Sequence, residues 1–207
     1  MKIHGVIVSE KLTAIRYKNK PGRHKKLNPV PFVGYPGLVH TAKEICEYIP
    51  KCKRFVEPFA GLGRISKNVI SEEKILNDLS DYAFEHNKRK FKNVIITKDD
   101  FLECVKKYDS HDTIFFFDPP WSNEIYEINP LTVNTMSVKE YYKKIEEILP
   151  SLKADWFIVS DENGPAKNIT GFHKLIKSKK PYLFGKYAKT HLVSNKPLKL
   201  QRQTTLM

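Results

Sequence analysis

From about residue 53 to residue 160 the chain alternates between short hydrophobic runs and amphipathic segments. Each run has the length of a strand and is bounded by polar or turn-forming residues. We therefore expect strands at 54–57, 74–77, 93–97, 113–117 and 156–160. Apolar positions at helical spacing predict helices over about 62–70, after Ser80, from about Asp100, and from Ser137 to Leu149. Repeated β-α-β-α units with short connections predict an α/β fold built on a doubly wound, mostly parallel sheet.

Three local signals add detail to this prediction. Residues 114–117 are four apolar residues in succession, which is typical of a central parallel strand buried on both faces. Ser137-Val-Lys-Glu140 has the form of a capping box at a helix start, and Thr41-Ala-Lys-Glu44 has the same form before a short helix. The segment 181–206 alternates enough to form two strands, so we expect an antiparallel hairpin at the C-terminal edge of the sheet.

The length and composition suit one folded domain. The chain has 207 residues, 41% of them hydrophobic, and we expect a basic arm over 1–40 and a single domain over 41–207. Three cysteines without a C-x-x-C pair, and histidines without metal-ligand spacing, argue against a disulfide framework and a metal site. The apolar runs are too short for a membrane helix and no secretory signal is evident, so we expect a cytoplasmic protein without a membrane partner.

Positive charge gathers at both ends of the chain. The net charge is +13; residues 1–26 contain eight Lys or Arg and one acid, and residues 163–207 contain ten and no acid. This distribution predicts a polyanionic partner, most often nucleic acid, although a solvated lysine-rich surface gives the same count. The candidate contacts are Lys25, Lys26, Lys177, Lys179 and Lys180.

Residues that can carry chemistry follow the ends of the predicted strands, where doubly wound sheets bind ligands. After the first strand, Gly61 and Gly63 allow a sharp turn and close approach of a ligand, although a plain strand-to-helix turn has the same pattern. Asp78 follows the second strand and could accept hydrogen bonds from a ribose diol or cap a helix. Asp100 and Phe101 follow the third and could bind an adenine amino group and ring, or again serve as a cap.

Asp118-Pro-Pro-Trp121, after the fourth strand, is the strongest signal in the chain. The two prolines lack an N–H, so this turn presents carbonyl oxygens, and Asp118 adds an anionic acceptor beside them. Trp121 adds a flat ring that can stack on a base. The arrangement suits the exocyclic amino group of a base taken out of its helix, and a rigid strand exit with a core tryptophan is the structural alternative.

In this order the motifs resemble those of S-adenosylmethionine-dependent amino-methyltransferases. Phe55-Val-Glu-Pro-Phe-Ala-Gly-Leu-Gly63 is similar to the Dam-type (D12 class) DNA adenine-N6 methyltransferases, and Tyr35-Pro-Gly37 resembles the leading cofactor motif of that family. The resemblance implies a class I methyltransferase fold, Rossmann-like, with S-adenosyl-L-methionine as cofactor and residues 41–207 as its catalytic domain. The residues that it assigns to the cofactor are Tyr35, Pro36, Phe59, Gly61, Gly63, Asp78, Asp100 and Phe101.

The same resemblance implies an enzyme, a site-specific adenine DNA-methyltransferase. Asp118 and the carbonyl of Pro119 would accept hydrogen bonds from the target N6 amino group, Trp121 would stack on the base, and Pro120 completes the motif. Two acceptors on these hydrogens favour a pyramidal nitrogen whose lone pair can point at the sulfonium methyl. Such a site contributes alignment and electrostatics rather than a strong base.

Two departures from the family pattern leave alternatives open. Leu38 and Val39 stand where the leading motif usually has Gly-Lys, and only residues 102–117 separate Phe101 from Asp118, where Dam-type enzymes usually carry a target-recognition insert. An RNA adenosine-N6 methyltransferase with the same site, acting on a base already unpaired, is therefore the second interpretation. The third is a nucleic-acid-binding subunit that needs a partner, and a partner subunit or a homodimer could supply target recognition.

Overall fold

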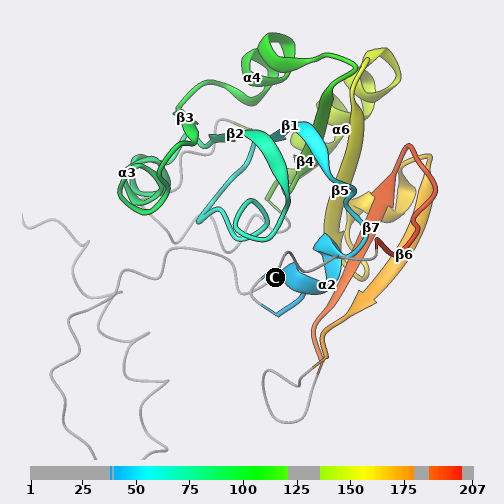
Figure 1. Ribbon diagram of the computed structural model, residues 1–207. Coiled ribbons are helices and arrows are strands. Elements are labelled where there is room, and N and C mark those ends of the chain that lie inside the picture. Colours follow the sequence, from blue (N-terminus) through cyan, green and yellow to red (C-terminus); the bar gives the residue numbers. More distant parts are fainter. Residues whose placement is uncertain (1–37, 39, 121–135, 180–186, 202–207) are drawn as a thin grey trace, which may run out of the picture. The chain divides into compact units, whose positions relative to one another are not determined.

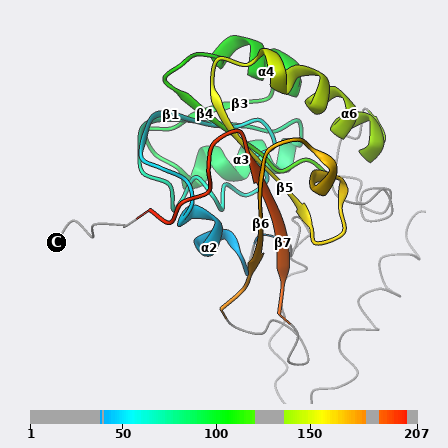
Figure 2. The same cartoon turned by 90° about the vertical axis from the view of Figure 1, so that its right-hand side faces the viewer.

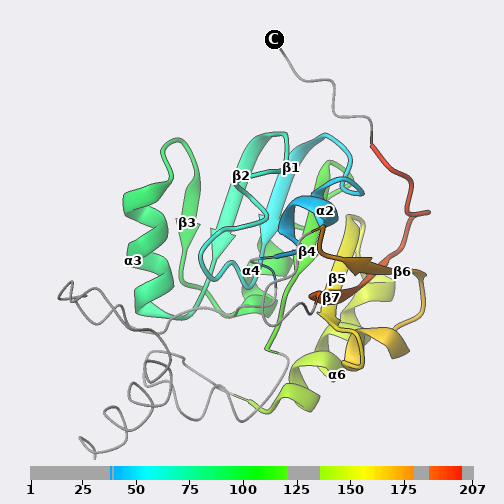
Figure 3. The ribbon, with the colours of Figure 1, turned by 90° about the horizontal axis from the view of Figure 1, so that it is seen from below.

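A seven-stranded sheet runs through the part of the chain that the computed structural model describes, residues 38, 40–120, 136–179 and 187–201 (Figure 1). Its strands are β1 (Cys52–Glu57), β2 (Ser71–Asn77), β3 (Ile95–Thr97), β4 (Thr113–Phe117), β5 (Asp155–Asp161), β6 (Phe172–Lys177) and β7 (Lys189–Ser194). They lie in the order β3-β2-β1-β4-β5-β7-β6 (Figure 3). The first five pair in parallel, whereas β7 is antiparallel to both β5 and β6. The predicted doubly wound sheet with an antiparallel C-terminal edge is confirmed.

Helices cover both faces of this sheet. They are α2 (Ala42–Cys46), α3 (Asp81–Lys90), α4 (Phe101–Tyr108) and α6 (Val138–Ile148), with short 3-10 turns η1 (Leu149–Ser151) and η2 (Pro165–Asn168). Helices α4 and α6 contribute to one core cluster, and α2 contributes to the other. Figure 2 shows α4 and α6 on one side of the strands and α2 on the opposite side.

Strand β4 confirms the prediction of a central strand buried on both faces. Phe115 and Phe117 belong to the core cluster of α4 and α6, whereas Ile114 and Phe116 belong to that of α2. All four side chains are at most 5% exposed. The side chains alternate between the two clusters because successive residues of a strand point to opposite faces. The end of β4 is therefore held rigidly from both sides.

The helix expected over about 62–70 is wrong: residues 61–68 form consecutive turns. Two helix-like bonds are present, from the Lys67 N–H to Gly63 O at 3.1 Å and from the Val69 N–H to Ile65 O at 3.1 Å. Between them, however, the Ser66 N–H donates to Glu57 Oε1 at 2.7 Å instead of to a carbonyl one turn back. A buried carboxylate from β1 thus replaces the helical bond that would continue the ladder.

The two predicted capping boxes have different outcomes. At α6 the Ser137 hydroxyl accepts from the Glu140 N–H and the Glu140 carboxylate accepts from the Ser137 N–H, so the box is confirmed. Thr41 precedes α2, but its side chain makes no cap bond. Its hydroxyl lies 2.8 Å from that of Thr190 on β7, so this box does not form. The helix itself is present and shorter than the apolar pattern suggested.

The C-terminal hairpin is present, but it begins earlier than predicted. Its first strand is β6, which precedes residue 181, and its second strand is β7. In the sheet β7 lies between β5 and β6, so β6 is the hairpin strand at the edge. No helix in the described ranges is long and apolar enough to cross a membrane.

Candidate functional site

Asn77, at the end of β2, joins the carboxyl ends of three strands. Its Nδ2 donates to the carbonyls of Pro58 at 3.1 Å and Asp99 at 2.9 Å. Its Oδ1 accepts from the Asp99 N–H at 2.8 Å and from the Thr97 hydroxyl at 2.7 Å. The side chain is 1% exposed, so these bonds satisfy a buried amide and fix the ends of β1, β2 and β3 relative to one another. Sequence reasoning overlooked Asn77; the signal was a polar residue ending an apolar strand.

Asp78 holds the glycine turn against the start of α3. One carboxylate oxygen accepts from the Gly61 N–H at 2.8 Å and the other from the Ser80 N–H at 2.9 Å. Burial raises the pKa of Asp78, and these two N–H bonds act in the opposite direction. The predicted cap of α3 is Ser80 itself, whose hydroxyl accepts from Ala83 N–H. Asp78 is thus a structural anchor that joins the glycine turn after β1 to the start of α3.

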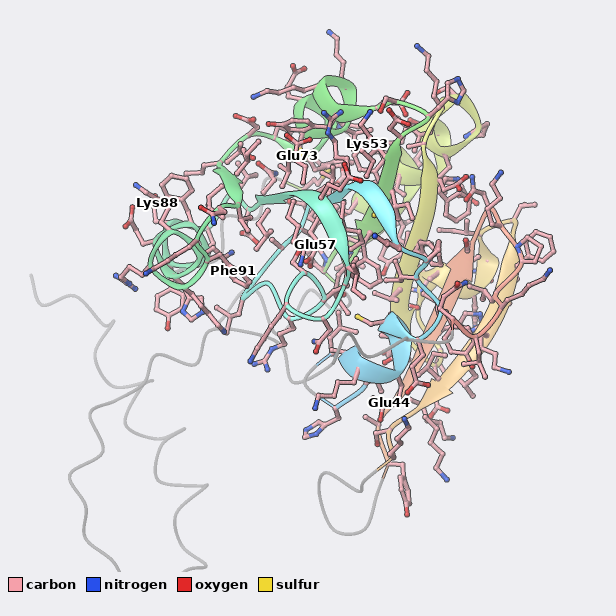
Figure 4. The ribbon with its side chains drawn as sticks, viewed as in Figure 1. Glu44, Lys53, Glu57, Glu73, Lys88 and Phe91 are labelled. Atoms are coloured by element: carbon pink, nitrogen blue, oxygen red, sulfur yellow. The ribbon has the colours of Figure 1, made fainter. Side chains whose placement is uncertain are left out.

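Both glycines of the turn have left-handed backbones, but their surroundings differ. Gly63, with φ +62°, is buried, and a Cβ there would lie 2.7 Å from side-chain atoms of Leu76 and Phe91 (Figure 4). Gly61, with φ +49°, is half-buried, and a Cβ there would have no described atom within 4 Å. Gly63 is therefore required by packing, whereas Gly61 offers bare backbone beside open space. This open backbone fits the approach of a cofactor to the turn.

Three polar side chains that sequence reasoning missed, the buried Glu57 and Asn87 and the half-buried Lys74, brace the same turn. Glu57, at the end of β1, is 2% exposed and accepts from the Ser66 N–H (Figure 4). Burial raises the pKa of Glu57 to about 7, while the bonds from Ser66 and the charge of Lys74 oppose that rise. Lys74 Nζ donates to Ser66 O at 2.7 Å, and Asn87 Nδ2 on α3 donates to Gly61 O at 2.9 Å. The turn is thereby attached to β1, β2 and α3.

The predicted aromatic contacts lie together beside the glycine turn. The rings of Phe59 and Phe101 are 5.0 Å apart, and Tyr141 of α6 packs edge-on against Phe59 at 5.6 Å. Phe101 and Tyr141 are 2% and 3% exposed, so they are core residues, and Phe59 is the more exposed member of the group. Asp100 accepts from the Leu102 N–H at 2.9 Å as the N-cap of α4, which was the structural alternative for this residue.

Asp118 and Pro119 follow directly on β4, beside the end of β5. Asp118 is half-buried, Pro119 is buried and Pro120 is half-buried. The Tyr142 hydroxyl on α6 donates to Val159 O of β5 at 2.9 Å. The pKa of Tyr142 lies well above its ordinary value because of burial and, next, the charges of Asp118 and Asp161. An acceptor set at the end of the central strand is therefore present, and Tyr142 is a neighbour that sequence reasoning did not identify.

The predicted basic contacts differ in their surroundings. Lys179 Nζ pairs with Glu47 at 2.5 Å, so an acid distant in sequence neutralises it. Lys177 Nζ instead lies 4.1 Å from the centroid of the Tyr187 ring. The other predicted site residues lie outside the described part of the chain: Tyr35, Pro36, Trp121, Lys25, Lys26 and Lys180. In that described part, no group of three or more His, Cys, Asp or Glu side chains could hold a metal ion.

A family model described as D12 class N6 adenine-specific DNA methyltransferase matches residues 39–110. The matched segment runs from α2 to α4 and includes the glycine turn, Asp78 and Asp100. The resemblance inferred from the motifs is confirmed over this segment, and it implies S-adenosylmethionine as the cofactor. The match ends before Asp118. No curated protein sequence matches the chain at a significant level.

Solved structures confirm the fold. A protein from Streptococcus mutans assigned as a SAM-dependent methyltransferase superposes with a TM-score of 0.51 at 16% identity, covering 78% of this chain and 49% of its own. The precorrin 8w decarboxylase of Methanobacterium thermoautotrophicum superposes with a TM-score of 0.52 at 13% identity, covering 79% and 93%. This chain thus spans about half the length of the Streptococcus mutans protein. Together with the strand order, these likenesses confirm the class I methyltransferase fold. At such low sequence identities they show the fold and say nothing about the reaction.

Proposed function

We propose that this protein transfers a methyl group from S-adenosylmethionine to the N6 amino group of adenine in DNA. One observation carries the proposal: the glycine turn and Asp118-Pro119 follow two neighbouring strands, β1 and β4. The strand order reverses between these strands, and ligands of doubly wound sheets bind at that point. A cofactor against Gly61 and a base against Asp118 would therefore meet at one edge of the sheet.

The residues of this chain would have separate roles toward the cofactor and the base. When bound, S-adenosylmethionine supplies an electrophilic methyl group. Gly61 backbone, Asp78, Asp100 and Phe59 would hold the cofactor. Asp118 and the Pro119 carbonyl would accept hydrogen bonds from the N6 hydrogens and orient the nitrogen lone pair. Alignment of the two reactants in a site with preorganised acceptors contributes most of the rate enhancement in such a reaction.

Transfer of labelled methyl from S-adenosylmethionine tests this proposal. The acceptors are duplex DNA, single-stranded DNA and RNA, and digestion with mass spectrometry identifies the modified base. We expect N6-methyladenine in DNA, no transfer by Asp118→Ala, and cofactor affinity of that variant within a few-fold of the wild type. Asp112→Ala, which removes an exposed carboxylate paired with Lys53, is the matched control and should keep full activity. Equal loss of cofactor binding and transfer in Asp118→Ala would remove Asp118 from its role at the base.

An RNA adenosine-N6 activity is the second candidate, and the connection before β4 favours it. Only residues 109–112 join α4 to β4, so this segment holds no target-recognition domain. A site without such a domain suits a base that is presented already unpaired, as in single-stranded RNA. Label found only in RNA would establish this alternative. Cofactor binding without transfer to any acceptor would instead point to a subunit that needs a partner.

A further inference from the structure

The β6–β7 hairpin has one exposed face with an unusual composition. In its antiparallel register Leu175 is opposite His191 and Lys177 is opposite Lys189, so these four side chains share one face. Leu175 is 49% exposed, and Tyr187, which precedes β7 and contacts Lys177, is 41% exposed. We call these five residues the hairpin face. Large apolar side chains at this exposure beside lysines are a feature that the fold itself does not require.

Like charges meet directly on the hairpin face. Lys177 and Lys189 are cross-strand partners, and such a pair of equal charges is destabilising. Lys177 Nζ lies over the Tyr187 ring, and Lys189 Nζ pairs with Glu162 at 2.8 Å. The pKa of His191 is lowered by burial, with the neighbouring His173 and Lys167 adding to the effect. Glu162 thus offsets the charge of Lys189, and Lys177 is the cation of this face at which a bound anion would gain most.

The charged end of the hairpin face lies at the same edge of the sheet as Asp118. Phe117, the last residue of β4, pairs with Ile158, and Asp161 at the end of β5 pairs with Thr190. Lys189 begins β7 next to Thr190, and Lys177 ends β6 opposite Lys189. Strands β7 and β6 are two and three strands from β4, about 10 and 14 Å across the sheet at the usual strand spacing, and Lys189 lies three residues, about 10 Å, beyond the level of Asp118 along the strands. Figure 1 shows β6 and β7 side by side at this end of the sheet.

We propose that the hairpin face binds the nucleic-acid strand that flanks the target base, with a phosphate at Lys177 and a base stacked on Tyr187. The inference rests on the proposed function and adds the place where its substrate is held. An aromatic ring beside cations is the combination by which proteins bind unpaired strands. Asp118 and the two lysines lie at the same end of the sheet, and a few nucleotides of an extended strand span the distance between them, so one substrate can reach both places. Lysines on an edge strand oppose pairing with another strand, which disfavours a second copy of this chain.

Opposite faces of the same hairpin provide matched variants for the test. Lys177→Ala and Tyr187→Ala alter the hairpin face. Lys174→Ala and Phe172→Ala remove an exposed lysine and a 48% exposed aromatic ring from the other face of β6. Binding of fluorescein-labelled single-stranded DNA and RNA is followed by anisotropy over a salt titration. Thermal unfolding of each variant confirms folding, and cofactor binding and methyl transfer are measured on the same preparations.

We expect Lys177→Ala to reduce the slope of log affinity against log salt by about 0.7, the value for one phosphate contact on a single strand. Tyr187→Ala should weaken binding at least about fivefold and leave the slope unchanged, because stacking involves no counterion. The two control variants should match the wild type. Equal effects of the variants on both faces of the hairpin would overturn the inference. Absence of oligonucleotide binding by the wild type would also overturn it, and would favour a protein partner at the hairpin face. Wild-type binding without methyl transfer would refute the proposed function and leave the hairpin face supported.

Discussion

Replacement of Glu57 by glutamine tests the central brace of the cofactor turn. The carboxyl is 2% exposed, and burial raises its pKa from 4.5 to about 7. At about 1.4 kcal/mol per pKa unit, this rise corresponds to about 3 kcal/mol of folding free energy. Between pH 4.5 and 7 the folded carboxyl keeps a proton that the unfolded chain has lost. The stabilisation of the folded state by Glu57 is therefore complete below pH 4.5, and it is lost as the pH rises through 7.

Urea unfolding of the wild type and Glu57→Gln between acidic and mildly alkaline pH measures this contribution. Glutamine keeps an acceptor for the Ser66 N–H but does not ionise, so its extra donors change stability equally at every pH. We expect the wild type to lose about 3 kcal/mol relative to the variant across this range. Glu72→Gln, an exposed position on β2, is the control and should run parallel to the wild type. Parallel curves for Glu57→Gln as well would refute the reasoning, because the carboxyl would then titrate as a hydrated group.

Two further predictions concern the same turn. Gly63→Ala should destabilise the protein by about 2 kcal/mol or more, since it combines a left-handed backbone with a Cβ that contacts Leu76 and Phe91 at 2.7 Å. Gly61→Ala meets open space, so thermal unfolding should show a loss of only about 1 kcal/mol while calorimetry shows weaker S-adenosylmethionine binding; equal melting losses in the two variants would contradict this. Asp78→Asn should lower cofactor affinity about tenfold, because an amide replaces the charged acceptor expected for the ribose diol, and unchanged affinity would restrict Asp78 to its structural bonds with Gly61 and Ser80.

Elements with strong local signals were predictable from the sequence. The four apolar residues that precede Asp118 fixed β4, because only a strand covered on both faces accommodates such a run. The capping box at Ser137 placed the start of α6 at the correct residue. In both places the signal itself is local, an apolar run for β4 and a hydrogen-bonded pair three residues apart for α6. The motifs after β1, β2 and β4 could be placed at one edge of the sheet because the carboxyl ends of parallel strands lie at the same edge.

Predictions failed where a distant residue replaced a local hydrogen bond. Glu57 takes the N–H of Ser66, so the segment after Gly63 forms turns rather than a helix. The Thr41 hydroxyl forms a hydrogen bond with that of Thr190, 149 residues away in the sequence, so the first capping box does not form. Strand β6 was misplaced for a different reason: Ile176 is its only buried residue, so the strand lacks the apolar alternation that marks a half-buried strand. Such outcomes depend on tertiary contacts that no local pattern contains.

The same distinction decides which lysines can bind a polyanion. In the sequence, residues 163–207 include ten basic residues and no acid, so all ten appear available to bind a polyanion. In the fold, Glu47 from α2 pairs with Lys179, and Glu162 after β5 pairs with Lys189. Lys177 instead contacts an aromatic ring, and its cross-strand neighbour is another lysine. A phosphate therefore gains more at Lys177 than at Lys179, where it must compete with a carboxylate, and charge reversal of Glu47 should increase nucleic-acid affinity through Lys179.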